Sequence, residues 1–153
     1  MQIRFSPFLF LVLACVLGSA AALADSHLTP SAPGATIGFA NLADGDTVPP
    51  GYTVRFTISG MGVAPAGSNI ENTGHFHLLI DLDELPPLDR PLPATDQVIH
   101  FGKGQTETTL DLPEGEHQLQ LLLADYAHVP HDPPLLSEVI SVRISADAAA
   151  AGD

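Results

Sequence analysis

The sequence predicts an all-β protein, an immunoglobulin-like β-sandwich of about seven strands with long loops rich in proline and glycine. Alternation of apolar and polar residues with a period of two recurs along the chain, whereas a helical period never persists. The 13 glycines and 14 prolines separate these segments, as turn residues do. A length of 153 residues suits one domain. The antibody-type disulfide and its tryptophan are absent, so this would be a bacterial variant of the fold. A small barrel is the competing architecture.

Residues 1–24 predict a signal peptide. Arg4 precedes a long apolar run that ends in Ala22-Leu23-Ala24, the small-x-small pattern that signal peptidase cuts. A membrane anchor and lipidation at Cys15 are the alternatives, and the clean small-residue ending favours cleavage after Ala24. The expected product is a periplasmic protein without a membrane span.

Cleavage would leave a chain without cysteine, because Cys15 is the only one. Disulfides, thiolate metal sites and cysteine nucleophiles are then excluded. Met61 is the only methionine beyond residue 1, which excludes a methionine-rich copper(I) site. Any metal must therefore be held by imidazole and carboxylate groups.

The charge balance narrows the range of partners. The chain has 18 acidic residues against five basic ones, and Arg4 among the basic residues is lost with the signal peptide. Such a surface repels nucleic acid and anionic lipid, so neither is an expected partner. Solubility is the simplest explanation for the excess of acidic residues.

The domain is expected at residues 36–145, between a flexible leader at 25–35 and a disordered tail at 146–153. Its strands are predicted at 36–42, 53–59, 75–81, 97–101, 106–112, 117–125 and 137–145.

The first strand, "TIGFANL", ends at the turn residues "DGD" and "PPG". The second alternates most clearly, with Val54, Phe56 and Ile58 on one face. In the third, "HFHLLID", alternation places Phe76 on the core face with Leu78 and Ile80, and the two histidines on the opposite face.

Four further strands complete the predicted domain. "GKGQ" between 97–101 and 106–112 predicts a hairpin turn. "HQLQLLLAD" follows "PEGE", and the final strand turns Ile140, Val142 and Ile144 inward. The loops 61–74, 82–96 and 125–134 are long for a compact sandwich, which is typical of functional loops.

His75 and His77 are candidate metal ligands. Side chains at i and i+2 of a strand start about 7 Å apart, and neutral imidazole binds zinc and copper(II). For an isolated pair, partly exposed histidines that hydrogen-bond loop carbonyls are the favoured explanation. Further histidines at strand ends and loops favour a site of three or four imidazoles, provided that they gather at one end of the domain. They are His100, His117, His128 and His131.

Enzymatic alternatives find little support in the sequence. His75, His77 and His100 match the ligand order of α-type carbonic anhydrases, but the chain is too short for that fold. The cupin pattern requires an earlier glutamate than Glu84. The chain has no G-x-S-x-G elbow, phosphate loop or EF-hand spacing. The protein is therefore not expected to be an enzyme.

Several long segments are similar to one bacterial family of exported proteins, known as domain of unknown function 4399. They are "SGMGVAPAG", "NTGHFHLLID", "PPLDRPLPATD" and "HFGKGQTETTLDLPEGEHQLQLLLADYAHVPHDPP", and they span about residues 52–145. The resemblance implies an exported single-domain β protein. All six candidate histidines match histidine positions of the family, which often also has histidine where Phe76 stands here. The resemblance implies no role for them.

The sequence thus predicts periplasmic binding or carriage of copper(II) or zinc. His75 and His77 would be the central ligands, completed by His100 and one of His117, His128 or His131. The alternative is a non-catalytic module that binds an envelope protein or glycan and whose histidines are structural.

Overall fold

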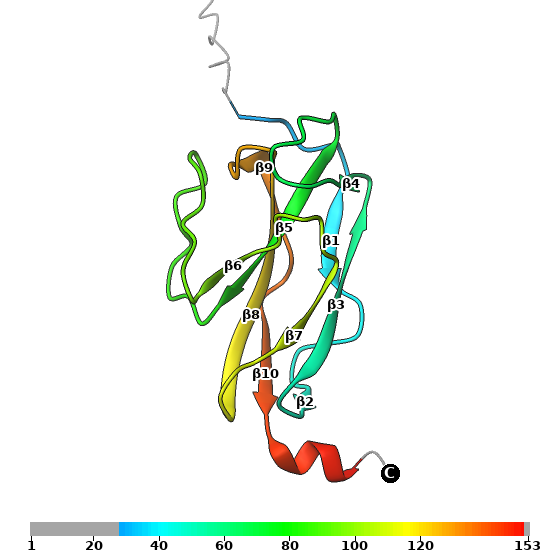
Figure 1. Ribbon diagram of the computed structural model, residues 1–153, viewed down its shortest axis with the longest axis vertical. Coiled ribbons are helices and arrows are strands. Elements are labelled where there is room, and N and C mark those ends of the chain that lie inside the picture. The colour runs from blue at the N-terminus through cyan, green and yellow to red at the C-terminus, as the bar shows by residue number, and fades with distance from the viewer. Residues whose placement is uncertain (1–27, 152–153) are drawn as a thin grey trace, which may run out of the picture.

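The computed structural model describes residues 28–151, and within this range it contains strands and a single 3-10 helix but no α-helix (Figure 1). The strands are β1 (Thr36–Phe39), β2 (Thr47–Val48), β3 (Tyr52–Ser59), β4 (Gly62–Val63), β5 (Thr73–Ile80), β6 (Val98–His100), β7 (Glu107–Leu110), β8 (Gly115–Ala124), β9 (Pro130–Leu136) and β10 (Ile140–Ile144). The predicted all-β class is confirmed. The predicted signal peptide, Cys15 and His27 lie outside the described residues.

The strands form two open sheets. The smaller has the order β1-β3-β7, and the larger has the order β2-β10-β8-β5-β4, with β6 also paired to β5 and β9 also paired to β8. The main core lies between the sheets, where Val54 and Phe56 of β3 pack with Phe76 of β5 and Leu121 of β8. Burial of these apolar side chains is the main source of stability. The architecture is sandwich-like, and its immunoglobulin-like character remains a prediction.

All seven predicted strands occur, as β1, β3, β5, β6, β7, β8 and β10. Strand β9 was not predicted, because its segment contains Pro130, Pro133 and Pro134. Proline has no N–H for a strand ladder and is tolerated at sheet edges. Among the strands of residues 28–151, β9 pairs only with β8, through Ala124↔Pro130 and two further residue pairs.

The predicted hairpin between β6 and β7 is wrong. The chain does turn here, with a Gly104 φ of 79° and a hydrogen bond of 3.0 Å from Gly104 N to Phe101 O. However, β6 pairs with β5 in the large sheet, whereas β7 pairs with β3 in the small one. The segment after His100 therefore carries the chain from one sheet to the other.

Both ends of the described chain are more ordered than predicted. Residues 29–31 were assigned to the flexible leader, yet Asp132 N donates to Thr29 O at 2.9 Å and Ser31 N donates to Asp132 O at 3.1 Å. The predicted disordered tail contains a 3-10 helix at Ala146–Ala151. Its first turn is held by a hydrogen bond of 3.0 Å from Ala146 N to Glu114 Oε1.

The outer face of the large sheet is also covered. Leu79 of β5 and Leu122 of β8 form a second apolar cluster with Leu92 from the proline-rich 82–96 loop. Leu92 N also donates to His128 O at 2.9 Å. This loop therefore buries the face of β5 that carries the two histidines.

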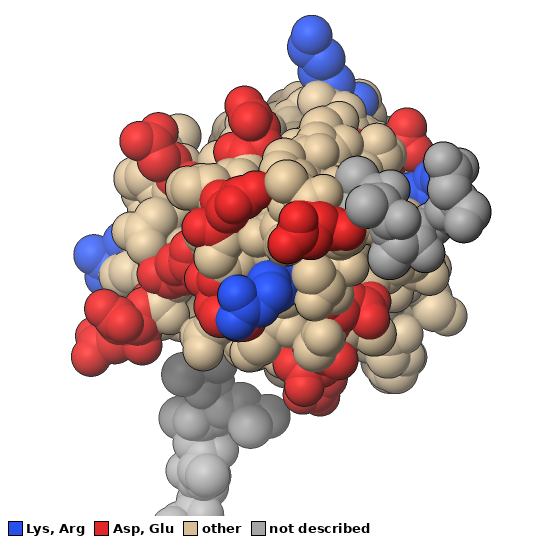
Figure 2. Space-filling model, turned by 90° about the horizontal axis from the view of Figure 1, so that it is seen from below, with Lys and Arg blue, Asp and Glu red and all other residues tan. Residues whose placement is uncertain are grey.

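The molecular surface is strongly acidic, in keeping with the formal net charge of −13. Figure 2 shows the molecule from below, with Asp and Glu side chains spread over this face and few Lys or Arg side chains between them. No helix within residues 28–151 has the length and apolar character needed to cross a membrane.

Candidate metal centre

Strand β5 places His75 and His77 side by side on the outer face of the large sheet. Phe76 between them points into the main core, as alternation predicts. The two imidazole centroids are 4.9 Å apart. Both side chains are buried, with exposed fractions of 0% and 1%. Histidine is seldom buried so completely without polar partners.

Strand β6 adds His100 through its register with β5. His77 and His100 are directly opposite across the antiparallel pair, and their rings are stacked at 5.1 Å with an interplanar angle of 28°. The His100 ring also lies 4.9 Å from that of His75. His100 is exposed, so the cluster opens to solvent on this side.

The turn after β8 adds His128, in a left-handed conformation with φ of 69°. Asp125, which is buried, shapes this turn: its Oδ1 accepts hydrogen bonds from Ala127 N at 2.8 Å and Val129 N at 3.0 Å. The His128 ring lies 4.7 Å from His100 and 5.0 Å from His75. Four imidazoles from three separate segments, β5, β6 and the turn after β8, thus form one cluster.

The ring nitrogens of this cluster lie close enough together to bind one metal ion. One ring nitrogen from each of His75, His100 and His128 lies within 4.8 Å of the others. Both nitrogens of His75 and the Nδ1 of His77 are buried without a hydrogen-bond partner. An unpaired buried polar atom costs about 1–3 kcal/mol, so these atoms are suited to a ligand that satisfies them.

The electrostatics favour the neutral form of three of these imidazoles, those of His75, His77 and His100. Burial, followed by the positive charge that His100 and His128 can carry, lowers the pKa of His75 to about 4. Burial and the neighbouring His75 lower the pKa of His77 to about 3. The pKa of His100 is also lowered, by burial and by His128. At neutral pH the rings of His75, His77 and His100 are therefore held in the neutral form, whose free lone pair binds metal ions.

Gly102 makes room for the ring of His100. A Cβ atom at residue 102 would lie 2.6 Å from His100 Nε2 and nearer still to Cε1. No side chain fits there unless the imidazole moves. Neither Gly102 nor Asp125 was predicted to belong to the site. The sequence gives only a weak signal for them. Gly102 follows the strand that carries His100, and Asp125 lies between the end of a strand and His128.

His131 is not part of the cluster. Pro130 pairs with Ala124, and Ala124 pairs with His75, so these three share the outer face and His131 points to the opposite one. There it is 1% exposed, and its Nδ1 lies 3.4 Å from Leu123 O. A Cβ on Gly74 would meet its ring at 2.9 Å. The imidazole of His131 therefore fills space on the core side of the sheet.

His117 lies at the other end of β8. Its Nδ1 is 2.7 Å from Asp81 Oδ2, and its Nε2 is 2.9 Å from Pro113 O. Both ring nitrogens thus have partners within the protein. Of the three histidines that the sequence offered to complete the cluster, the structure brings only His128 to it.

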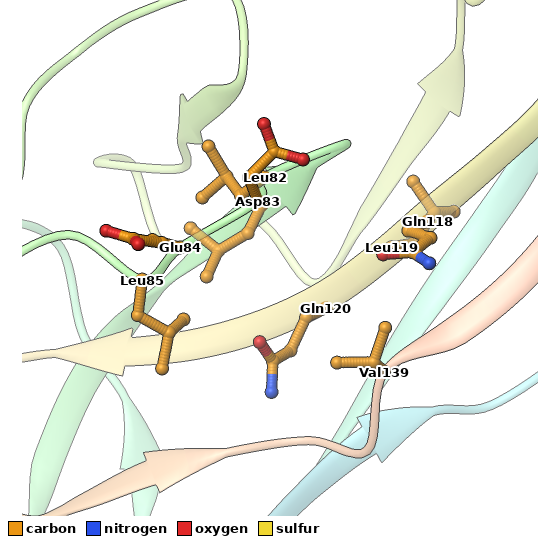
Figure 3. Close-up of a pocket in the computed structure, with 9 residues that line it drawn as sticks. Leu82, Asp83, Glu84, Leu85, Gln118, Leu119, Gln120 and Val139 are labelled. Carbon is orange, nitrogen blue, oxygen red and sulfur yellow. The ribbon is translucent and has the colours of Figure 1, made fainter.

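A groove of about 340 Å³ lies on the outer face near this end of the sheet (Figure 3). Gln118 and Gln120 of β8 project between the segment that follows β5 and Val139. It is lined by Leu79, Leu82, Asp83, Glu84, Leu85, Gln118, Leu119, Gln120 and Val139. No histidine lines it, so the groove and the cluster are separate features.

Neither the curated proteins nor the solved structures contain a match to this chain. One family model matches, over residues 54–145, a range that includes every member of the histidine cluster. The resemblance found in the sequence is thereby confirmed. The chain belongs to the family described as Domain of unknown function (DUF4399).

Proposed function

We propose that the protein binds a transition metal ion, copper(II) or zinc, through His75, His77, His100 and His128, and acts in the periplasm in metal binding or carriage. The observation that carries this proposal is the environment of His75. Its ring is fully buried, neither nitrogen has a protein partner, and three other imidazoles surround it. A buried polar group without any partner is rare unless a ligand satisfies it.

The donor set suits borderline divalent ions. Imidazole nitrogen binds zinc and copper(II) well, and copper(II) has the highest affinity of the first-row divalent series. His75, His100 and His128 supply three donors whose nitrogens are already close together. His77 supplies the fourth, although its ring is 6.4 Å from that of His128 and must approach as the ion binds.

Four imidazoles favour binding over catalysis. A four-coordinate ion with four protein ligands has no open position for water or substrate, whereas catalytic zinc sites keep one. The exposed ring of His100 gives an ion a route in and out, which suits a carrier. The protein is thus proposed to be a non-enzymatic metal-binding protein.

Titration of metal-free protein tests the proposal. After chelator treatment, stoichiometric copper(II) or zinc should raise the melting temperature, because a ligand at 100 times its Kd adds about 2.7 kcal/mol to the free energy of unfolding. His75→Ala should abolish the increase, and the control His117→Ala should retain it. No thermal shift with either ion, or an undiminished shift in His75→Ala, would refute the proposal.

The second candidate is an envelope interaction module. It is favoured by the groove of Figure 3, where Leu85 and Val139 have exposed fractions of 45% and 51%. Exposed aliphatic side chains beside a groove are typical of contact surfaces. This candidate replaces the first if metal-free protein binds neither ion.

A further inference from the structure

Asp125 differs from the other acidic residues of the described chain. Among residues 28–151 it is the one acidic residue that is buried, with an exposed fraction of 5%. No Lys, Arg or His side chain of this range forms an ion pair with it. Buried charges in proteins are normally paired with an opposite charge or with a metal ion. No positive side chain of residues 28–151 therefore balances the charge of Asp125.

Three hydrogen bonds hold this carboxylate at the turn that carries His128. Its Oδ1 accepts from Ala127 N at 2.8 Å and from Val129 N at 3.0 Å, the backbone amides on either side of His128. Its Oδ2 accepts from Thr29 Oγ1 at 2.7 Å. All three donors are neutral groups, so they fix the position of the negative charge without cancelling it.

The register of the large sheet also brings this charge close to His75. Ala124 is the Cα partner of His75, and Asp125 follows Ala124 directly. Burial is the main cause of the low pKa of His75, and the charge of Asp125 opposes it by raising that pKa. A carboxylate that stabilises a positive charge on this ring also stabilises a positive ion bound to the ring.

The effect of such a carboxylate depends on the charge of the ion. Imidazole binds metal ions in its neutral form, so the ligands themselves do not reduce the charge of the bound ion. The attraction between a fixed carboxylate and an ion is proportional to the ion's charge, so it is twice as large for copper(II) or zinc as for copper(I). Burial strengthens this attraction, because the local dielectric is low and salt screens a buried charge weakly.

We propose that Asp125 makes the histidine cluster selective for divalent over monovalent ions, as the buried counter-charge of a bound copper(II) or zinc ion. The inference rests on the proposed function and adds the class of ion that the site selects. Asp125 is not a ligand in this proposal. It positions His128 through the two backbone amides, and it acts on the ion through its charge.

Asp125→Asn tests this role, because it replaces the charge by a neutral amide of the same shape whose oxygen can still accept from both backbone amides. Binding at the cluster is the part of metal binding that His75→Ala removes. It is measured in the purified protein by competition with chelators for copper(II), for zinc and, without oxygen, for copper(I). Affinity should fall about 100-fold for copper(II) and zinc but about 10-fold for copper(I), since the logarithm of the loss is proportional to the ion's charge.

Two further variants separate charge from structure. Asp132→Asn is the matched control: it removes the same charge from an exposed position, and the bonds of Asp132 to Thr29 and Ser31 use backbone atoms that the substitution keeps. It should leave the ratio of copper(II) to copper(I) affinity unchanged, because solvent and salt screen an exposed charge. Asp125→Ser is a second charge-free variant, since a serine hydroxyl also accepts from backbone amides in turns. It should lower the ratio about 10-fold, as Asp125→Asn does.

The possible failures are distinguishable. An equal loss of affinity for copper(I), copper(II) and zinc in both Asp125 variants would overturn the inference and leave Asp125 a purely structural residue of the turn. A fall of the ratio in Asp132→Asn as large as in Asp125→Asn would overturn it too, because burial of the charge would then have no effect. If the parent protein binds none of these ions at the cluster, the proposed function fails together with this inference.

Discussion

His75 and His117 are the same residue type in neighbouring strands of one sheet, yet their environments are opposite. His117 contacts two atoms that can only accept hydrogen bonds, Asp81 Oδ2 and Pro113 O, so both of its nitrogens must donate. His75 has no hydrogen-bond partner at either nitrogen. Burial lowers the pKa of His117, but these bonds outweigh it and raise the pKa overall, whereas the pKa of His75 is lowered to about 4.

This contrast distinguishes a structural histidine from a candidate ligand. His117 behaves as an imidazolium ion whose protons are used to join Asp81 to the segment before β8. His75 behaves as a neutral base whose lone pair is unused. Converging histidines whose nitrogens the protein leaves unsatisfied are therefore a better indicator of a metal site than the number of histidines in a chain. One unsatisfied nitrogen alone does not indicate a site, because His131 Nε2 is also buried without a partner but lies outside the cluster.

The largest expected effect is that of His75→Leu. Metal affinity should fall by about 100-fold or more, since even residues behind a ligand contribute 10- to 100-fold. The metal-free protein should become more stable by about 1–3 kcal/mol, because an apolar side chain replaces two unpaired buried nitrogens. Calorimetric titration and chemical denaturation measure the two effects. Lower stability of the metal-free variant would mean that His75 is a satisfied structural residue after all.

Gly102→Ala should reduce metal affinity by about 10- to 100-fold without changing any ligand, because a methyl group at this position displaces the His100 ring. Gly38→Ala is the matched control: a Cβ on Gly38 of β1 has Thr57 Oγ1, at an ordinary 3.5 Å, as its only close contact. Equal affinities of the two variants, measured by competition with a chelator, would show that His100 is not a ligand.

Acid should destabilise the metal-free protein. The pKa values of His75 and His77 are about 4 and about 3 in the fold, against about 6.5 in the unfolded chain. The unfolded chain then binds more protons below pH 6.5, so stability decreases as the pH falls from 6.5 towards 4. Between pH 7 and 4.5 the melting temperature should drop by on the order of 5 °C more in the parent than in His75→Leu. Parallel pH profiles would contradict the depressed pKa.

The smallest effect is expected from His117→Gln, with the opposite pH dependence. Because folding raises the pKa of His117, its stabilising effect is complete below the unfolded value near 6.5 and is lost as the pH rises through the folded value. The variant should lose about 1 kcal/mol at pH 5.5 and less at pH 9, with unchanged metal affinity. A larger loss at pH 9 than at pH 5.5 would show that His117 is neutral in the fold.

Alternation along the strands was sufficient to predict most of the fold and half of the site. It identified Phe76 as a core residue and placed His75 and His77 together on the other face, as the structure has them. It did not predict that this face is buried, because the cover comes from Leu92 in a loop with no periodicity. Local pattern carries no information about which distant loop folds over a strand.

The choice among His117, His128 and His131 was equally beyond the sequence. It depends on the register of β9 against β8 and on the turn that Asp125 shapes, and both are tertiary features. The prolines of β9 do not favour a strand in sequence analysis, so the sequence predicts a loop at His131. It therefore does not predict the face of the sheet to which the His131 side chain points. The wrong hairpin after His100 has a similar cause, because a tight turn does not specify the sheet in which the next strand pairs.

The passage of the chain between the sheets after His100 has a mechanical consequence. An ion held by His75, His100 and His128 would link three segments that are distant along the sequence. The segment that contains His100 continues directly into the opposite sheet. Residues 28–151 contain no cysteine, so such a bond would act there as a cross-link does, by shrinking the denatured ensemble. Release of the ion would then destabilise both sheets at once. Resistance to proteolysis would therefore show whether an ion is bound.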